Sequence, residues 1–197
     1  MKILAAIGSF TGIAAENASL YQKVKEMALT DSLTGVNNRL SFQEILVRES
    51  QRVRHSGHSV CLLMIDVDDF KNVNDTYGHL IGDRVLRDIA AILKFSVRKS
   101  DSVARFGGDE FVVLMPSADE TEGLKLANRI QESIREWNAK EKVPGLKMKV
   151  SIGIHAGHPE NADSLLLEAD REMYRCKTFR KKKCQIISEK QMNLAVA

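Results

Sequence analysis

A continuous apolar run over residues 59–65, Ser-Val-Cys-Leu-Leu-Met-Ile, leads directly into the acidic stretch Asp66-Val-Asp-Asp69. Because polar and apolar residues do not alternate in this run, it predicts a strand buried on both faces near the centre of a sheet. Carboxylates at the end of such a strand lie at a sheet edge, where proteins with open sheets commonly bind ligands. We therefore expect Asp66 to belong to a binding site.

A glycine-rich segment over residues 105–111, Arg-Phe-Gly-Gly-Asp-Glu-Phe, contains a second group of acids. The β-forming runs at residues 102–106 and 111–115 predict a hairpin with this segment at its tip. Gly107 and Gly108 permit positive φ angles and a close approach of the backbone to a ligand. Taken alone, the segment fits an ordinary turn with solvated acids equally well.

The two acidic segments are more informative together than apart. If the hairpin lies beside the buried strand, the carboxylates of Asp66, Asp109 and Glu110 converge at one edge of the sheet. Hard oxygen ligands with room for water suit Mg²⁺ or Mn²⁺ bound together with the phosphates of a substrate.

The remaining pattern predicts an α+β domain with a ferredoxin-like sheet, antiparallel or mixed, flanked by helices. After a helix over residues 39–55, the predicted order is strand, helix, helix, strand, strand, helix, strand, helix, strand. The predicted helices cover residues 70–77, 81–95, 120–138 and 163–176, and the later strands cover residues 147–154 and 184–187.

The composition is that of an ordinary globular chain. It has 197 residues, 44% of them hydrophobic, which suffices for one domain with a full core. The net charge of +3 is too small to indicate a nucleic-acid or membrane partner. Cys61, Cys176 and Cys184 lack the spacing of metal ligands, so a cytoplasmic location is expected. We find no signal-peptide cleavage site and no run long enough to span a membrane.

Apolar residues recur at helical spacing from Ile3 to Met27 and predict an amphipathic helix. Residues 14–21, Ala-Ala-Glu-Asn-Ala-Ser-Leu-Tyr, resemble the last helix of a GAF sensory domain; a helix packed on its own domain is the alternative. Pairing of two copies as a parallel coiled coil would cover the apolar stripe, so we expect a homodimer. We accordingly predict a stalk over residues 1–30, a main domain over 31–190 and a tail over 191–197.

Several short motifs form a specific combination. They are Asp66-Val-Asp-Asp-Phe-Lys71, Asn74-Asp75, Gly78-His79, Gly82-Asp83 and residues 107–111, preceded by Asp-Ser-Leu-Thr-Gly-Val-Asn-Asn-Arg at residues 31–39. Together they resemble the GGDEF family of diguanylate cyclases, from about residue 31 to residue 187. The resemblance implies a fold of the nucleotidyl-cyclase or polymerase-palm type. It also implies condensation of two GTP molecules into cyclic di-GMP, with two Mg²⁺ or Mn²⁺ ions per active site.

The same resemblance assigns roles to individual residues. Metal binding falls to the carboxylates of Asp66, Asp109 and Glu110 and to the carbonyl of Val67, with Asp109 and Glu110 as the catalytic residues and Asp109 as the candidate general base. The GTP phosphates are assigned to the backbone of Phe70, Lys71, Gly107 and Gly108 and to the cations of Lys71, Lys177 and Lys181. Asn74 and Asp83 are assigned to the guanine edge, with His79 near the sugar or base.

Two departures from the family pattern concern the C-terminal basic run. Arg180 replaces the usual turn glycine and Lys182 the usual asparagine, which makes the phosphate role of Lys181 less secure than that of Lys177. A basic solvated loop is the alternative interpretation of this run.

A product-inhibition site is implied by the Arg-x-x-Asp pattern of Arg98 and Asp101, which stands just before the hairpin. Arg129 on the following helix is expected to contribute a second wall of that site. Cyclic di-GMP bound there would inhibit from a distance, since the site is separate from Asp66 and Asp109.

Two other functions were weighed. A catalytically silent GGDEF domain could act as a receptor for GTP or cyclic di-GMP, but such a receptor has no need of both metal carboxylates. A ferredoxin-like domain that binds nucleic acid would show exposed aromatic residues on its strands and a broad basic face, and the sequence indicates neither.

Overall fold

The computed structural model describes residues 29–56, 58–157, 162–179 and 186–187. Its strands are β1 (Val60–Val67), β2 (Ser102–Arg105), β3 (Glu110–Pro116), β4 (Val150–Gly157) and β5 (Ile186–Ile187). They form one sheet in the order β2-β3-β1-β4-β5, antiparallel except for the parallel pair β4 and β5. The predicted mixed α+β sheet with β1 at its centre is therefore confirmed.

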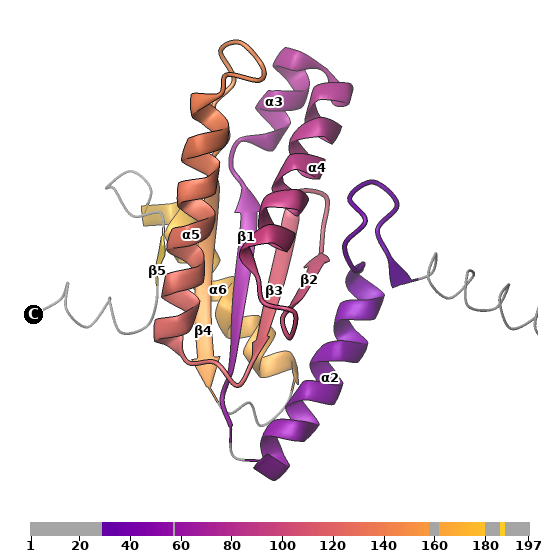
Figure 1. Ribbon diagram of the computed structural model, residues 1–197, viewed down its shortest axis with the longest axis vertical. Coiled ribbons are helices and arrows are strands. Elements are labelled where there is room, and N and C mark those ends of the chain that lie inside the picture. Colours follow the sequence, from indigo (N-terminus) through magenta and orange to yellow (C-terminus); the bar gives the residue numbers. More distant parts are fainter. Residues whose placement is uncertain (1–28, 57, 158–161, 180–185, 188–197) are drawn as a thin grey trace, which may run out of the picture.

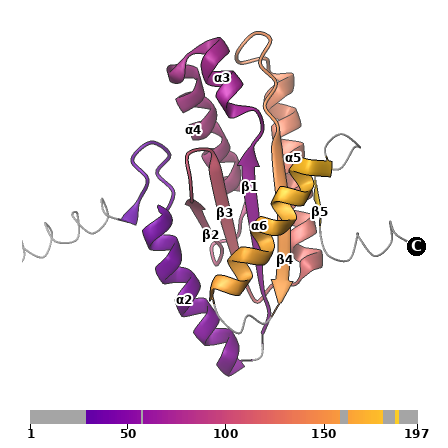
Figure 2. The same cartoon turned by 180° about the vertical axis from the view of Figure 1, so that it is seen from behind.

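In the described residues, the helices that accompany this sheet are α2 (Arg39–Ser56), α3 (Phe70–Tyr77), α4 (His79–Ser96), α5 (Glu120–Ala139) and α6 (Ala162–Phe179). Figure 1 shows α4 and α5 in front of the sheet, and Figure 2, from behind, shows α6 across the other face with α2 beside the β2 edge. Within the described residues, none of the helices combines the length and the apolar character that crossing a membrane requires.

The two faces of β1 explain why its sequence is apolar from Val60 to Ile65. Cys61, Leu63 and Ile65 belong to the core cluster under α4 and α5. Leu62 and Met64 belong to the cluster under α2 and α6. Side chains alternate between the faces of a strand, so the even-numbered residues that follow, beginning with Asp66, lie on the α6 face.

Local signals account for how α5 starts and how closely α6 packs. Asp119 caps α5 by accepting a hydrogen bond from the Glu122 backbone N–H, and Glu122 accepts one from the Asp119 N–H in return. On the other face, a Cβ on Gly153 would lie 2.1 Å from the backbone nitrogen of Met173. A glycine in β4 is therefore what lets α6 approach the sheet so closely.

Several predicted strand boundaries differ from the observed ones by one to three residues, and two of them matter here. The first strand does not end at Ile65 but continues to Val67, so Asp66 lies inside the ladder. The strand predicted from Lys147 starts at Val150, because the side chain of Asn138 binds both the N–H and the carbonyl of Met148, at 2.7 and 2.8 Å. The stalk predicted over residues 1–30 and the tail over 191–197 lie almost entirely outside the described residues.

Candidate active site

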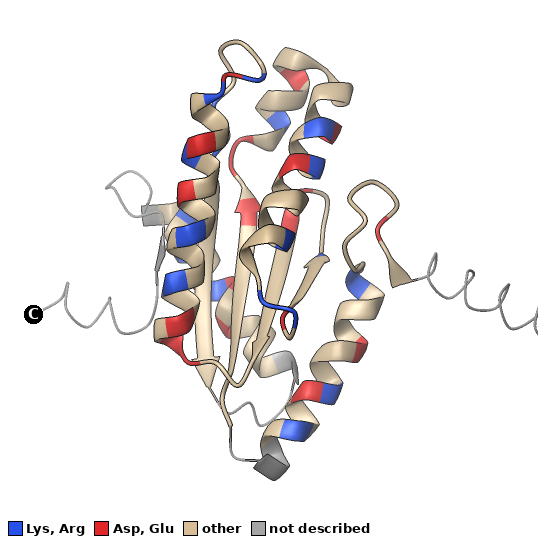
Figure 3. Ribbon diagram, in the orientation of Figure 1, with Lys and Arg blue, Asp and Glu red and all other residues tan. Residues whose placement is uncertain are grey.

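Two acids face each other where β1 ends and β3 begins. Asp66 and Glu110 are paired across the antiparallel ladder, so their side chains leave the same face of the sheet. The carbonyl of Asp109 accepts a hydrogen bond from the Val67 N–H at 3.1 Å, which ties the hairpin to the end of β1. Figure 3 shows acidic segments at these ends of β1 and β3. The structure thus places two of the three predicted acids, Asp66 and Glu110, on neighbouring strands at the same edge.

The charges at this edge are only partly balanced. Asp66 is 3% exposed, and its carboxylate lies 2.5 Å from the ammonium group of Lys177 on α6. Burial raises the pKa of Glu110, and the negative charges of Asp66, Asp109 and Asp170 raise it further, with Lys177 opposing them. A cluster whose members disfavour each other's ionisation is a good environment for an added cation.

This unfavourable charge predicts the effect of Glu110→Gln on stability. Because the pKa of Glu110 is raised in the folded state, its contribution to stability is complete at low pH and is lost as pH rises through the folded-state pKa. Without divalent cations, we expect Glu110→Gln to raise the melting temperature at pH 7–8 and to have progressively less effect toward pH 4. Thermal unfolding across this pH range is the measurement, and a gain that is equal at pH 4 and pH 8 would contradict the assignment.

The hairpin tip differs from the prediction in one respect. Neither Gly107 nor Gly108 has a positive φ angle; among the described glycines, Gly35, Gly78 and Gly145 do. A Cβ on Gly107 would lie 2.5 Å from a carboxylate oxygen of Glu110, so a larger residue there would displace the Glu110 side chain. A Cβ on Gly108 would meet nothing within 4 Å, so this face of the tip is open to a ligand.

Arg105 holds the hairpin tip to the start of the domain, a role that the sequence analysis missed. Its guanidinium donates to the carbonyl of Gly108 at 2.6 and 3.1 Å and to both carboxylate oxygens of Asp31 at 3.2 Å. Burial alone would raise the pKa of Asp31, but hydrogen bonds from Thr34 and Arg105 outweigh it and hold the pKa below its usual value. Arg105 belongs to the glycine-rich segment and Asp31 to the motif at residues 31–39, but nothing in the sequence indicates that their side chains form a bond.

The predicted guanine-reading residues lie where α3 packs against α4. A Cβ on Gly82 would overlap the Asn74 side-chain oxygen, at 1.9 Å, and would lie 3.3 Å from the Phe70 ring. Asn74 therefore lies directly over the backbone beside Asp83. Asp83 itself is partly exposed and is 3.9 Å from Arg87.

The other predicted substrate residues are less closely grouped. His79 is exposed in the first turn of α4, and Lys71 is exposed on α3. Lys177 is engaged with Asp66 rather than free. Lys181 lies outside the described residues, as do Arg180 and Lys182.

The predicted product-site residues occupy a separate region after α4. The carboxylate of Asp101 accepts a hydrogen bond from the Arg98 N–H at 2.9 Å, which closes the turn into β2. The Arg98 guanidinium donates to Glu122 on α5 at 2.7 Å and raises its own pKa through that bond. Arg129 is exposed two helical turns after Glu122, on the same side of α5. A pocket of about 290 Å³ is lined by Arg98 and Asp101 but not by Arg129.

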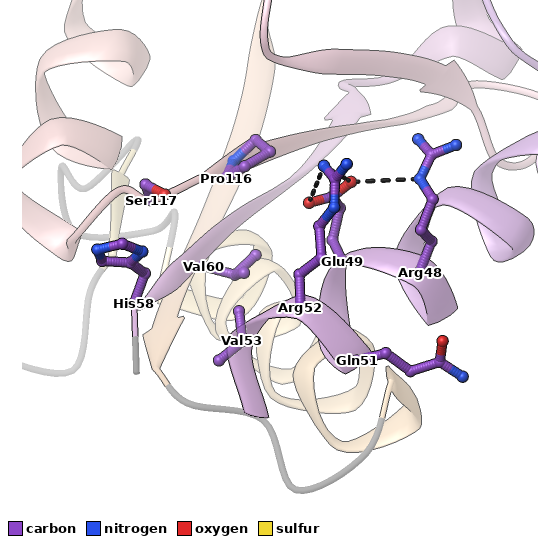
Figure 4. A pocket seen from close by; sticks show the side chains of 9 residues that line it. All are labelled: Arg48, Glu49, Gln51, Arg52, Val53, His58, Val60, Pro116 and Ser117. Atoms are coloured by element: carbon purple, nitrogen blue, oxygen red, sulfur yellow. Dashed lines mark hydrogen bonds and ion pairs between the residues drawn. The ribbon is translucent and has the colours of Figure 1, made fainter. Parts of the chain in front are cut away.

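A pocket of about 570 Å³ lies between the C-terminal part of α2 and the strand ends Val60 and Pro116, at the other end of β1 from Asp66. In Figure 4, Arg48 and Arg52 of α2 both reach the buried carboxylate of Glu49. Since its acid is already neutralised by two arginines, this pocket offers no free carboxylate for a cation. The acidic edge is therefore the better candidate for metal-dependent chemistry.

Comparison with known proteins gives results that agree with this geometry. The sequence model described as "Diguanylate cyclase, GGDEF domain" matches residues 28–183. Diguanylate cyclase DgcP of Pseudomonas aeruginosa is 40% identical over 154 residues, covering 78% of this chain and 23% of that protein. Diguanylate cyclase A of Treponema denticola is 34% identical over 180 residues, covering 89% of this chain and 47% of that protein.

Solved structures are similar as well. The coiled coil and GGDEF domain of DgcB from Caulobacter crescentus, in complex with c-di-GMP, superposes with a TM-score of 0.84 at 25% identity, covering 94% of this chain and 98% of that one. The diguanylate cyclase SiaD from Pseudomonas aeruginosa, in complex with its activator SiaC, has a TM-score of 0.73 at 29% identity, covering 94% and 73%. This chain spans less than half of the two curated relatives named above.

Proposed function

Because this chain belongs to the GGDEF family of diguanylate cyclases, we propose that it condenses two GTP molecules into cyclic di-GMP and two pyrophosphates. The observation that best supports this function is the pairing of Asp66 with Glu110 beside the hairpin tip. In each of two steps, the 3′-oxygen of one GTP bonds to the α-phosphorus of the other, and the bond to pyrophosphate breaks. Asp109 is the proposed acceptor of the hydroxyl proton.

The family generally depends on a divalent metal, and the residues of this site fit one. Among the described residues, no set of three or more His, Cys, Asp or Glu side chains is already arranged as a metal site. The pKa of Glu110 is nevertheless raised, first by burial and then by the negative charges of Asp66, Asp109 and Asp170, and a cation would relieve that repulsion. We propose that Asp66, Asp109, Glu110 and the Val67 carbonyl hold two Mg²⁺ or Mn²⁺ ions. Such ions neutralise developing charge and orient phosphates.

We propose that the two ends of GTP bind to two different parts of the site. Asn74 and Asp83 would bind the guanine edge between α3 and α4, with His79 nearby. A carboxylate that accepts from the guanine N1 and N2 hydrogens discriminates against adenine, which would leave it unpaired. The open face of Gly107–Gly108 and the turn at Phe70–Lys71 would surround the triphosphate, with Lys177 and Lys181 as cations.

Each domain of this kind has one proposed GTP site, so the reaction needs two domains facing each other. We propose that the stalk over residues 1–30 forms a homodimer that brings two main domains, residues 31–190, together. The free thiols of Cys61 and Cys176 support a reducing, cytoplasmic location.

The proposed function is tested by product analysis after stripping bound nucleotide. We expect purified protein with GTP and Mg²⁺ to form cyclic di-GMP and pyrophosphate, and we expect ATP to yield no cyclic dinucleotide. Binding of GTP or cyclic di-GMP without any product would contradict the cyclase and favour the silent receptor.

Product inhibition is proposed to act through Arg98, Asp101 and Arg129. We expect Arg98→Ala to raise the cyclic di-GMP concentration needed for half-inhibition by at least about tenfold, because a charge-assisted contact to the product is lost. Initial rates at saturating GTP should stay within about twofold, since Arg98 lies away from Asp66. The control is Arg135→Ala, which removes an exposed arginine of α5 that forms an ion pair with Glu132. Unchanged inhibition in Arg98→Ala would exclude this site.

A further inference from the structure

A buried carboxylate beside the acidic edge has so far no assigned role. Asp68 is 6% exposed, and its Oδ1 accepts a hydrogen bond at 2.8 Å from the hydroxyl of Ser151, which is 0% exposed. Burying a carboxylate is unfavourable unless it is hydrogen-bonded, so a buried Asp–Ser pair points to a specific requirement at this position.

The pair lies where β1 meets β4. The Asp68 N–H donates to the Lys149 carbonyl at 3.0 Å, so Asp68 is attached to the β4 side through both its backbone and its side chain. Ser151 stands opposite Asp66 in the ladder, but its one hydroxyl hydrogen is donated to Asp68. The hydroxyl therefore supports the turn after Asp66, while Lys177 is the partner of Asp66.

The turn that follows is conformationally strained. Asp69 has φ 55° and ψ 29°, in the left-handed region, and no side-chain hydrogen bond from it caps α3. A non-glycine residue keeps this conformation only where its surroundings impose it. The residue before it, Asp68, is held by two hydrogen bonds, one to Lys149 just before β4 and one to Ser151 in β4. From Asp69 the chain enters α3 at Phe70, with the Val73 N–H donating to the Asp69 carbonyl at 3.1 Å.

We propose that Asp68 and Ser151 are positioning residues that fix the turn at Asp69–Lys71 and thereby the backbone N–H groups that bind the GTP phosphates. The inference rests on the proposed function, because it requires the turn to face a triphosphate. Substrate affinity should then depend on a hydroxyl that never touches the substrate. The dependence should also be specific to the phosphates, because the guanine edge is bound elsewhere, by Asn74 and Asp83.

The test is calorimetric titration with Mg²⁺ and 3′-deoxy-GTP, which lacks the hydroxyl needed for condensation, compared with GMP. Ser151→Ala and Asp68→Ala should each weaken 3′-deoxy-GTP binding about tenfold and leave GMP binding unchanged. Asp68→Asn, which keeps an acceptor for Ser151, should stay within about twofold of the wild type. Hydrogen exchange at the Val73 amide should accelerate in the two alanine variants only.

Ser50→Ala is the matched control, because Ser50 is also a buried serine but lies on α2, and its hydroxyl has no hydrogen-bond partner among the described residues. If Ser151→Ala has the same 3′-deoxy-GTP affinity and the same exchange rate at the Val73 amide as Ser50→Ala, the inference is wrong and the proposed function is unaffected. A wild-type protein that does not bind 3′-deoxy-GTP would overturn the proposed function together with it. If Ser151→Ala does not fold, equal affinity in Asp68→Ala and Asp68→Asn overturns the inference.

Discussion

Asp66→Asn is expected to lower the rate of cyclic di-GMP synthesis at least about 1000-fold, which corresponds to about 4 kcal/mol of transition-state stabilisation. Asp66 is the most buried of the three acids and stands directly opposite Glu110, so losing its charge removes the centre of the proposed metal site. The fold should persist, because asparagine has nearly the same shape and relieves repulsion with Glu110. The measurements are the steady-state rate and the melting temperature with and without Mg²⁺.

The matched control is Asp88→Asn. Asp88 is also partly buried and also has a lysine partner, Lys142 at 3.4 Å, but it lies on α4 and accepts a hydrogen bond from Trp137. An asparagine there can still accept that bond, so activity should stay within about twofold of the wild type. If Asp66→Asn retained synthesis comparable to that of Asp88→Asn, the assignment of the metal site to this sheet edge would be wrong.

Gly153→Ala is expected to lower the free energy of unfolding by about 3 kcal/mol, at the upper end of the usual cost of overpacking. A Cβ at this position would lie 2.1 Å from the nitrogen and 2.6 Å from the Cα of Met173, and 2.6 Å from the carbonyl oxygen of Ala169. All three are backbone atoms of α6, which cannot rotate away as a side chain can. The melting temperature should fall by about 6–12 °C.

The control for this second variant is Gly108→Ala, where an added Cβ would meet nothing within 4 Å. Its melting temperature should stay within about 2 °C of the wild type. An equal, small loss in both variants would show that α6 packs less closely against β4 than the structure indicates. Because α6 contains Lys177, a displaced helix should also weaken GTP binding in Gly153→Ala.

The fold could be predicted wherever local composition and tertiary packing agree. β1 is apolar because helices cover both of its faces, and this is visible in seven consecutive residues of sequence. The start of β4 could not be predicted, because it depends on Asn138 from the preceding helix binding the backbone of Met148. No sequence pattern indicates that these two residues form hydrogen bonds with each other.

The candidate site, like the fold, could be predicted only in part from the sequence. The approach of Asp66 and Glu110 was predicted on the condition that the hairpin lies beside the first strand, and the structure meets that condition. The bond from Arg105 to Asp31 spans 74 residues, and the bond from Ser151 to Asp68 spans 83, so neither has a local signature. Gly107 and Gly108 do not use the positive φ angles that glycine permits, and a Gly-Gly pair in the sequence does not reveal this.

The central claim is that two of these domains, each holding one GTP, make cyclic di-GMP together. The most direct test is the specific activity with GTP and Mg²⁺ as a function of protein concentration, with product identified by chromatography. We predict that activity per protein molecule rises with concentration and levels off once the dimer is complete. Protein that binds GTP or cyclic di-GMP but forms no cyclic di-GMP at any concentration would contradict the claim.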